Sequence, residues 1–244
     1  MTPGPVVLIT GTDTEVGKTW VTSALFAYFQ AHAPKLRVAL FKPLQSGAVG
    51  DQEHYHWLFD LEQSPAEVNP VSFQAPLAPP LAAALENKEI DLAPIWQTLQ
   101  HLRANYDLVL MEGIGGLGSP ITWEWTVADL VGAWRIPIVL VVPVRLGAMG
   151  QAVANLALAR EKKLTVRGLI RNCLTPCTDM QLAQWANPEL LETLTHRPVL
   201  GTLPYLGKNV EKDDIPTLAN AAANLQLEAL FPEILGTGLE LHHL

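Results

Sequence analysis

The chain is poor in cysteine and in basic residues, and each shortage excludes a class of protein. Its 244 residues include only two cysteines, Cys173 and Cys177. This is too few for a disulfide framework, and their spacing, with Pro176 between them, does not fit a C-x-x-C redox motif. Lys and Arg number 16 against 24 Asp and Glu, a net charge of −8. An acidic chain repels nucleic acid and anionic membranes, so neither is expected as a partner.

Long apolar runs are missing as well. The longest, Ile136 to Val144, has nine residues and contains two prolines, about half of the ~20 residues that a membrane-spanning helix needs. No basic stretch precedes the apolar run that starts at Val6, so the N-terminus does not read as a signal peptide. Hydrophobic residues make up 49% of the chain and charged ones 16%, enough to bury a core. The composition therefore predicts a soluble, cytoplasmic globular protein.

Short apolar runs alternate with helical patterns along most of the chain. The runs are apolar at both odd and even positions, which is typical of parallel strands covered on both faces. The predicted strands are Val6–Thr10, Arg37–Lys42, Asp107–Met111, Pro137–Val144, Val166–Arg171 and Pro198–Leu203. The predicted helices are Lys18–Gln30, Asp51–Leu61, Leu92–Ala104, Gly150–Lys163, Met180–Leu194 and Ile215–Leu230.

This alternation predicts an α/β fold in which a doubly wound, mostly parallel sheet carries helices on both faces. No linker or internal repeat divides the chain, so residues 1–235 are expected to form one domain, followed by a tail from 236 to 244. The proline-rich region from Ser64 to Pro80 is interpreted as an ordered surface loop.

A phosphate-binding loop follows the first predicted strand, where Gly11 to Thr19 read G-T-D-T-E-V-G-K-T. A strand that runs into Gly-Lys-Thr and then a helix is the context that such a loop requires. Backbone N–H groups and Lys18 would bind the phosphates of ATP, and the Thr19 hydroxyl would bind Mg²⁺. The spacing departs from the usual loop, because five residues rather than four separate Gly11 from Gly17. The alternative is a strand-to-helix turn that binds no phosphate and has Gly-Lys-Thr at the start of its helix by chance.

Two further polar clusters follow predicted strands. K-P-L-Q-S-G runs from Lys42, and Asp51 begins the next helix, where it could equally be a helix cap. Y-D-L-V-L-M-E-G-I-G-G places Glu112 at the end of a third strand. Ligands of open α/β sheets bind at the carboxyl ends of the strands, so Lys42 and Glu112 are expected to face the phosphate loop.

These three motifs, in this order, resemble those of the dethiobiotin synthetases, ATP-dependent cyclo-ligases of the P-loop NTPase type. The resemblance runs from about Val6 to Glu211 and includes weaker matches at G-L-I-R-N-C and G-T-L-P-Y-L, which end at Cys173 and Leu206. It implies a synthesis of dethiobiotin, ADP and phosphate from 7,8-diaminononanoate, CO₂ (or bicarbonate) and ATP, with Mg²⁺. It also implies a homodimer with active sites at the subunit interface.

The resemblance also assigns roles to individual residues. Lys18, Lys42 and Thr14 are implied to be catalytic, and Thr19, Asp51 and Glu112 to bind Mg²⁺. Substrate is implied to contact Ser46, Gly116 and Gly150. The implied ATP contacts are Glu15, Val16, Gly17, Lys18, Thr19, Trp20, Asp51, Glu112, Gly113, Ile114, Gly115, Asn172, Cys173, Pro204, Tyr205, Leu206 and Glu211.

Three alternatives stay open at this point. A cobyrinate-type amidotransferase-linked synthetase shares the loop, but needs a glutaminase domain for which 244 residues leave no room. A partition-type ATPase switch carries a lysine early in its loop, where this chain has Asp13. An inert nucleotide-binding subunit would bind ATP without making a product.

Four other residues invite a functional reading that the sequence does not favour. His54 and His56 lie two apart on a predicted helix and so point in different directions, which makes a metal pair improbable. Both histidines are interpreted as surface residues. Trp123 and Trp125 are interpreted as packing residues, either buried or in an interface.

Overall fold

A computed structural model describes residues 3–47, 50–208 and 210–236 of the chain. Apart from Gly236, the tail predicted from 236 to 244 lies outside the described residues. No helix within the described part of the chain is long and apolar enough to cross a membrane.

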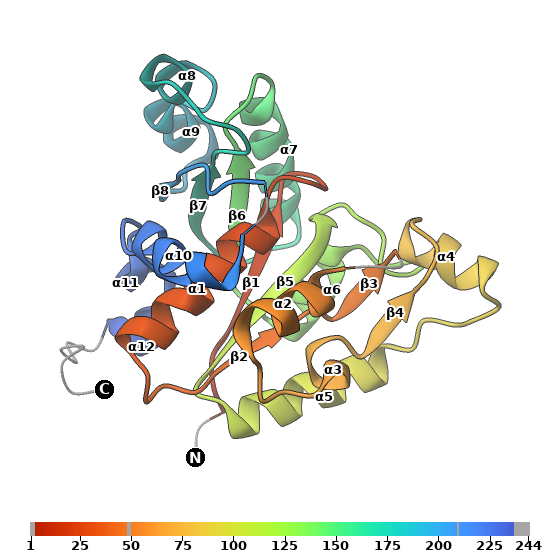
Figure 1. The fold of residues 1–244 in the computed structure, drawn as a ribbon. Helices are drawn as coiled ribbons and strands as arrows, with labels where there is room; N and C mark the ends of the chain where they lie inside the picture. The colour runs from red at the N-terminus through yellow and green to blue at the C-terminus, as the bar shows by residue number, and fades with distance from the viewer. Residues whose placement is uncertain (1–2, 48–49, 209, 237–244) are drawn as a thin grey trace.

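The centre of the fold is a six-stranded sheet whose strand pairs are all parallel (Figure 1). The strand order is β2-β5-β1-β6-β7-β8. The bounds are β1 Val6–Gly11, β2 Val38–Phe41, β5 Leu108–Gly116, β6 Ile138–Pro143, β7 Val166–Asn172 and β8 Val199–Leu203. All six predicted strands are therefore confirmed, and so is the predicted doubly wound fold class.

A second, two-stranded parallel sheet lies to one side of the large one (Figure 1). It pairs β3 (Leu44–Ser46) with β4 (Val71–Phe73). Helices α3 (Pro65–Val68) and α4 (Pro79–Leu85) flank β4 in the chain. The interpretation of Ser64 to Pro80 as a loop was therefore wrong, because prolines in this region begin helices at their first turn, where a missing N–H is tolerated.

The helices otherwise follow the prediction, with three differences. Met180–Leu194 is two helices because Pro188 begins a new one, and Ile215–Leu230 breaks where Gln226 N donates to Leu200 O. Helices α6 and α12 and the short helix η1 were not predicted. The remaining bounds are α1 Lys18–His32, α2 Asp51–Phe59, α5 Leu92–Asn105, α6 Val127–Trp134, α7 Ala148–Glu161, α8 Asp179–Gln184, α9 Pro188–Thr195, η1 Lys212–Asp214, α10 Ile215–Ala222, α11 Leu227–Leu230 and α12 Pro232–Leu235.

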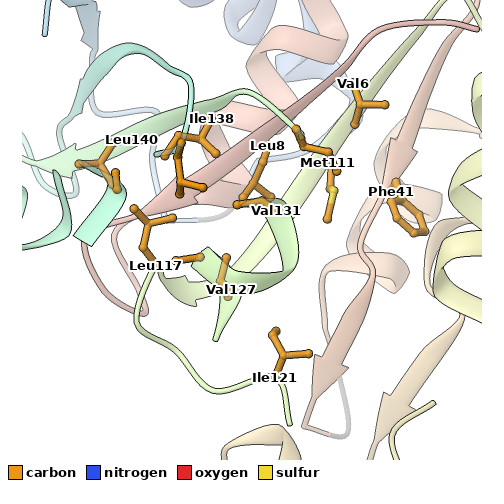
Figure 2. Packing of buried hydrophobic residues seen from close by; sticks show 14 of the residues in the cluster. Val6, Leu8, Phe41, Met111, Leu117, Ile121, Val127, Val131, Ile138 and Leu140 are labelled. Atoms are coloured by element: carbon orange, nitrogen blue, oxygen red, sulfur yellow. The ribbon is translucent and has the colours of Figure 1, made fainter. Parts of the chain in front are cut away.

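The core consists of two layers, one on each face of the large sheet. Because successive side chains of a strand point to opposite faces, Val6 and Leu8 of β1 join one layer and Val7 and Ile9 join the other. Figure 2 shows the first layer, in which Leu8 packs near Val131 of α6. The second layer packs beneath α1 and α10. With both faces covered, ligands can approach only at the ends of the strands or at the edges of the sheet.

Candidate functional site

The phosphate loop follows β1 and ends at Gly17, the N-cap of α1. Gly17 has φ 85°, a left-handed conformation that favours glycine. A Cβ atom at this position would lie 2.0 Å from Nδ2 of Asn172. Within the loop, Lys18 Nζ donates to the backbone oxygen of Asp13 at 3.0 Å. The conformation of Gly17 and the hydrogen bond of Lys18 therefore fix the shape of the loop that leads into α1.

Asn172, the last residue of β7, forms a hydrogen bond with this loop. Its Nδ2 donates to the backbone oxygen of Val16 at 2.9 Å, and the residue is 1% exposed. The bond connects the carboxyl end of β7 directly to the loop after β1. The resemblance implied an ATP contact for Asn172, and the structure adds a bond to the loop.

Four polar groups from distant parts of the chain meet beside the loop. Thr19 Oγ1 lies 2.8 Å from Asp51 Oδ1 and 3.1 Å from Glu112 Oε1. Lys42 Nζ lies 2.8 Å from Glu112 Oε1 and also pairs with Asp51 Oδ2. Lys42 is 4% exposed and Glu112 is 1% exposed. The structure brings these residues together as predicted, although Glu112 lies within β5 and not at its end, and Asp51 begins α2.

Tyr55 on α2 completes this network, and the sequence analysis missed it. The side chain is fully buried, and its hydroxyl donates to Glu112 Oε2. Tyr55 lies four residues after Asp51, one helical turn along α2. That spacing was a usable signal, because a residue one turn from a predicted metal ligand lies on the same face of the helix.

Burial and charge shift the ionisation of these groups in different directions. Burial lowers the pKa of Lys18 to about 8, although Glu112 opposes the shift. Burial alone would lower the pKa of Lys42, but Glu112 and Asp51 outweigh it and raise that pKa. Burial would raise the pKa of Asp51, yet Lys42 brings it down to about 2. Burial and the charge of Asp51 raise the pKa of Glu112.

The donor set of Thr19, Asp51 and Glu112 fits Mg²⁺. All three side chains present oxygen, the ligand that this small, hard cation prefers. Their oxygens converge, since Thr19 Oγ1 is within 3.1 Å of a carboxylate oxygen of each acid. Two carboxylates and a hydroxyl beside a phosphate loop match the usual arrangement of nucleotide-bound magnesium.

These residues line a cavity of about 480 Å³. A second, smaller hollow adjoins it through Trp20 and Leu174, which line both. The first is lined by Thr14, Glu15, Gly17, Lys18, Thr19, Trp20, Lys42, Gln45, Ser46, Asp51, Glu112, Ile114, Gly115 and Leu174. The second is lined by Trp20, Asn172, Cys173, Leu174, Pro204, Tyr205, Leu206 and Gly207. Gln45, Leu174 and Gly207 were not predicted.

Five predicted site residues do not line either hollow. The side chain of Val16 is buried, and Gly113 offers its backbone oxygen to Lys42 Nζ at 3.3 Å. Gly116 faces the backbone oxygen of Gly11, which a Cβ atom would approach to 3.0 Å.

The other two, Gly150 and Glu211, lie further from the phosphate loop. Gly150 is exposed on the first turn of α7, next to Gln151, whose Nε2 donates to Asp13 Oδ2 at 3.5 Å. Glu211 is exposed and caps η1. The predicted roles of all five residues stay predictions.

Some interpretations of aromatic residues need correction. His54 and His56 are half-buried rather than surface residues. The ring of His54 packs edge-on against Trp20, with the ring centroids 5.7 Å apart. Trp123 is not buried, since it is 75% exposed, whereas Trp125 is half-buried. Both cysteines are free thiols.

Comparisons with known proteins agree with the geometry of this site. The AAA domain family matches residues 6–212. An ATP-dependent dethiobiotin synthetase of Gloeothece citriformis is 50% identical over 226 residues, covering 93% of this chain and 98% of that protein. The enzyme of the same name from Crocosphaera subtropica is 50% identical over 225 residues, or 92% and 99% of the two chains. The enzyme of the same name from Bacillus subtilis strain 168 is 30% identical over 227 residues, which cover 90% of this chain and 95% of that protein.

Solved structures with a similar fold are more distant in sequence. A ParA family ATPase from Chlorobium tepidum has a TM-score of 0.52 at 14% identity, covering 95% of this chain and 93% of that one. The MinD cell division protein of Aquifex aeolicus has a TM-score of 0.53 at 14% identity, covering 97% and 99%. At this identity the likeness describes the fold alone.

Proposed function

Because the chain belongs to the family of ATP-dependent dethiobiotin synthetases, which are ATP-dependent ligases, we propose that it makes dethiobiotin, ADP and phosphate from 7,8-diaminononanoate, CO₂ and ATP. One observation carries the proposal. Two lysines, Lys18 and Lys42, share a cavity with the oxygens of Thr19, Asp51 and Glu112. Such a site neutralises phosphate charge on several sides at once.

The substrate supplies its own nucleophile in this reaction. One amine adds to CO₂, giving a carbamate and releasing a proton. A carbamate oxygen attacks the γ-phosphorus while the bond to the ADP oxygen breaks, which yields a carbamic-phosphoric anhydride. The second amine then attacks the anhydride carbonyl, phosphate leaves with its electron pair, and loss of a proton closes the ureido ring. The protein needs no covalent intermediate, so positioning and charge stabilisation are its tasks.

Each of these tasks has a candidate residue. Lys18 and Lys42 would flank the transferred phosphoryl group. Thr14 and Ser46 would orient the oxygens of the carbamate and the phosphate. The Ser46 hydroxyl oxygen is buried without a hydrogen-bond partner among the described residues. A buried hydroxyl of this kind gains free energy when a substrate oxygen bonds to it.

Thr19, Asp51 and Glu112 would hold Mg²⁺. When bound, the ion neutralises charge on the β- and γ-phosphates of ATP. The short distances between Thr19 Oγ1 and both carboxylates support this assignment.

The smaller hollow would take the adenine base. Asn172 donates to the phosphate loop through Nδ2, which leaves Oδ1 to accept from the exocyclic amine of the base. Cys173 and the turn from Pro204 to Leu206 would form the walls. The backbone of the loop from Glu15 to Trp20, Gly113, Ile114 and Gly115 would complete the nucleotide contacts.

We also propose a homodimer in which the start of α7 reaches the partner's substrate, with Gly116 and Gly150 near that substrate. Helix α7 contacts the phosphate loop through Gln151. Leu146, just before α7, is 82% exposed. A subunit interface at the start of α7 would cover this apolar side chain. A domain of residues 1–235 located in the cytoplasm is part of the same proposal.

Product formation tests the proposed function directly. Purified protein is mixed with diaminononanoate, bicarbonate, Mg²⁺ and ATP, and dethiobiotin is measured by mass spectrometry. We expect product only when all four are present. ATP hydrolysis without dethiobiotin, in the presence of diaminononanoate, would instead indicate another carboxylate-forming substrate or an ATPase switch.

A further inference from the structure

Strand β2 forms one edge of the large sheet, so half of its backbone groups face away from the sheet. Leu108 N of β5 donates to the backbone oxygen of Arg37. Since bonding direction alternates along a strand, Arg37, Ala39 and Phe41 face β5. Val38, Leu40 and Lys42 therefore direct their N–H and C=O groups outward. An outward row of unpaired groups is a template for another chain unless it is covered.

The chain itself covers two of these three positions. Lys42 N donates to Val68 O at 2.7 Å, and Asn69 Nδ2 donates to Lys42 O at 2.7 Å. Leu40 N donates to Gln63 Oε1 at 2.8 Å, and Gln63 Nε2 donates to Leu40 O at 2.9 Å. The Gln63 carboxamide thus bonds to Leu40 as one residue of a neighbouring strand would.

Val38 is the outward position that no described residue covers. No group of residues 3–47, 50–208 or 210–236 bonds to its outward N–H or C=O. Val38 lines a cavity of about 630 Å³, larger than that of the candidate functional site. Phe26 and Phe59 form apolar walls, and each is 4% exposed. A cavity with apolar walls on one side, polar groups on the other, and one open backbone donor and acceptor has the make-up of a binding site.

The charges around the cavity are mainly negative. Asp60, Glu62 and Glu67 line it, against Arg37 and the ring of His101. Arg37 pairs with Asp107 and Asp60 pairs with Lys212, both outside the lining, and His101 pairs with Glu67. Glu62 makes no ion pair within the described part of the chain. A ligand with a positive charge is favoured at such a rim.

We propose that this cavity binds an extended, basic peptide segment. One residue of the segment exchanges both of its backbone hydrogen bonds with Val38, as Gln63 does with Leu40, in the manner of strand addition. A lysine or arginine side chain of the segment lies toward Glu62. The site is separate from the nucleotide cleft, because no residue lines both cavities.

The test uses two capped tripeptides, acetyl-Ala-Lys-Ala-amide and its counterpart with glutamate in place of lysine, titrated by calorimetry. We expect the basic peptide to bind at least about fivefold more tightly at low salt, with the difference shrinking as salt is added. Val38→Pro removes the outward N–H at the first residue of an edge strand, where proline is tolerated. It should weaken peptide binding about tenfold, the typical value of one hydrogen bond.

Val38→Ala is the matched control, because it alters the side chain but keeps the N–H. We expect its affinity to stay within about twofold of that of the unmodified protein. Glu62→Gln should reduce the preference for lysine over glutamate. Should Val38→Pro fail to fold, amide exchange of Val38 in the unmodified protein decides, since bound peptide must slow it.

Either of two results would overturn the proposal. One is that the unmodified protein binds both peptides equally tightly, or binds neither of them. The other is a folded Val38→Pro variant whose peptide affinity equals that of Val38→Ala.

Discussion

Lys42 lies almost fully buried between two carboxylates, with its ammonium within hydrogen-bond distance of Glu112 and Asp51. Lys42→Ala removes the charge expected beside the transferred phosphoryl group. We expect kcat to fall about 100-fold or more, because the contact strengthens in the transition state. Lys88→Ala, at an exposed lysine, is the control and should leave turnover unchanged. Normal turnover by a correctly folded Lys42→Ala protein would remove Lys42 from the mechanism.

Tyr55 carries a prediction of a different kind, because it contacts Glu112 and not the substrate. Tyr55→Phe leaves Glu112 Oε2 buried without its donor, which should lower the free energy of unfolding by about 1–3 kcal/mol. Metal affinity should fall about 10- to 100-fold, as for other residues that orient a metal ligand. Mn²⁺ binding measured by paramagnetic resonance checks this effect, and urea unfolding checks stability. Tyr28→Phe, at a tyrosine on α1, is the control, and equal metal affinity in both variants would contradict the assignment.

At the residue scale, the sequence predicted the groups that come from recognisable motifs. Thr19 follows the loop after β1, Lys42 follows β2 and Glu112 lies within β5, and parallel topology brings such positions together. Tyr55 was missed because a tyrosine on an amphipathic helix looks like an ordinary core residue. The bond from Asn172 to the loop was missed because nothing in the sequence specifies which strand end lies beside which loop.

At the scale of elements, α6 begins with a reciprocal cap that makes its stability depend on pH. Asp129 accepts from the backbone N–H and hydroxyl of Thr126 and pairs with Lys162. The hydrogen bond from Lys162, followed by those from Thr126, lowers the pKa of Asp129 from 3.8 to about 2. A lowered carboxylate pKa adds stability above the ordinary pKa and loses it as the pH falls toward the shifted one.

Asp129→Asn should therefore destabilise the protein by about 1 kcal/mol at pH 7, the usual size of a cap or a solvent-screened ion pair. The difference from the unmodified protein should shrink between pH 4 and pH 2, where Asp129 itself becomes protonated. Urea midpoints at pH 7, 4 and 2.5 measure both quantities. A difference that is independent of pH would contradict the role of the charge.

The strands of the large sheet were predictable because each is a continuous apolar run bounded by other structure, whereas β3 and β4 were not. Each of these two strands has only three residues, and their pairing joins Leu44 to Val71 across a stretch that contains two helices. Local pattern cannot specify such a pairing. Helix α6 was missed because Val127–Trp134 has only eight residues, fewer than the roughly 10–12 that distinguish a helix from a short apolar strand in sequence.

At the scale of the whole molecule, the proposed dimer places Leu146, which is 82% exposed, at the subunit interface. We expect sedimentation to give a mass twice that of the 26.6 kDa chain. Leu146→Asp should shift the protein toward monomer, because it places a charge in the proposed interface. Exposed Leu85→Asp, on α4, is the control, and a monomeric unmodified protein would contradict the dimer.

The position of β1 in the sheet has a consequence for synthesis of the chain. Strand β1 leaves the ribosome before both of its neighbours in the sheet, β5 and β6, which begin at Leu108 and Ile138. At about 5–20 residues per second, both edges of the apolar Val6–Gly11 segment wait roughly 5–20 s for a partner. During that interval the nascent chain exposes an uncharged, β-branched segment prone to aggregation. Truncations that end before Leu108 leave β1 without either neighbour and should be insoluble.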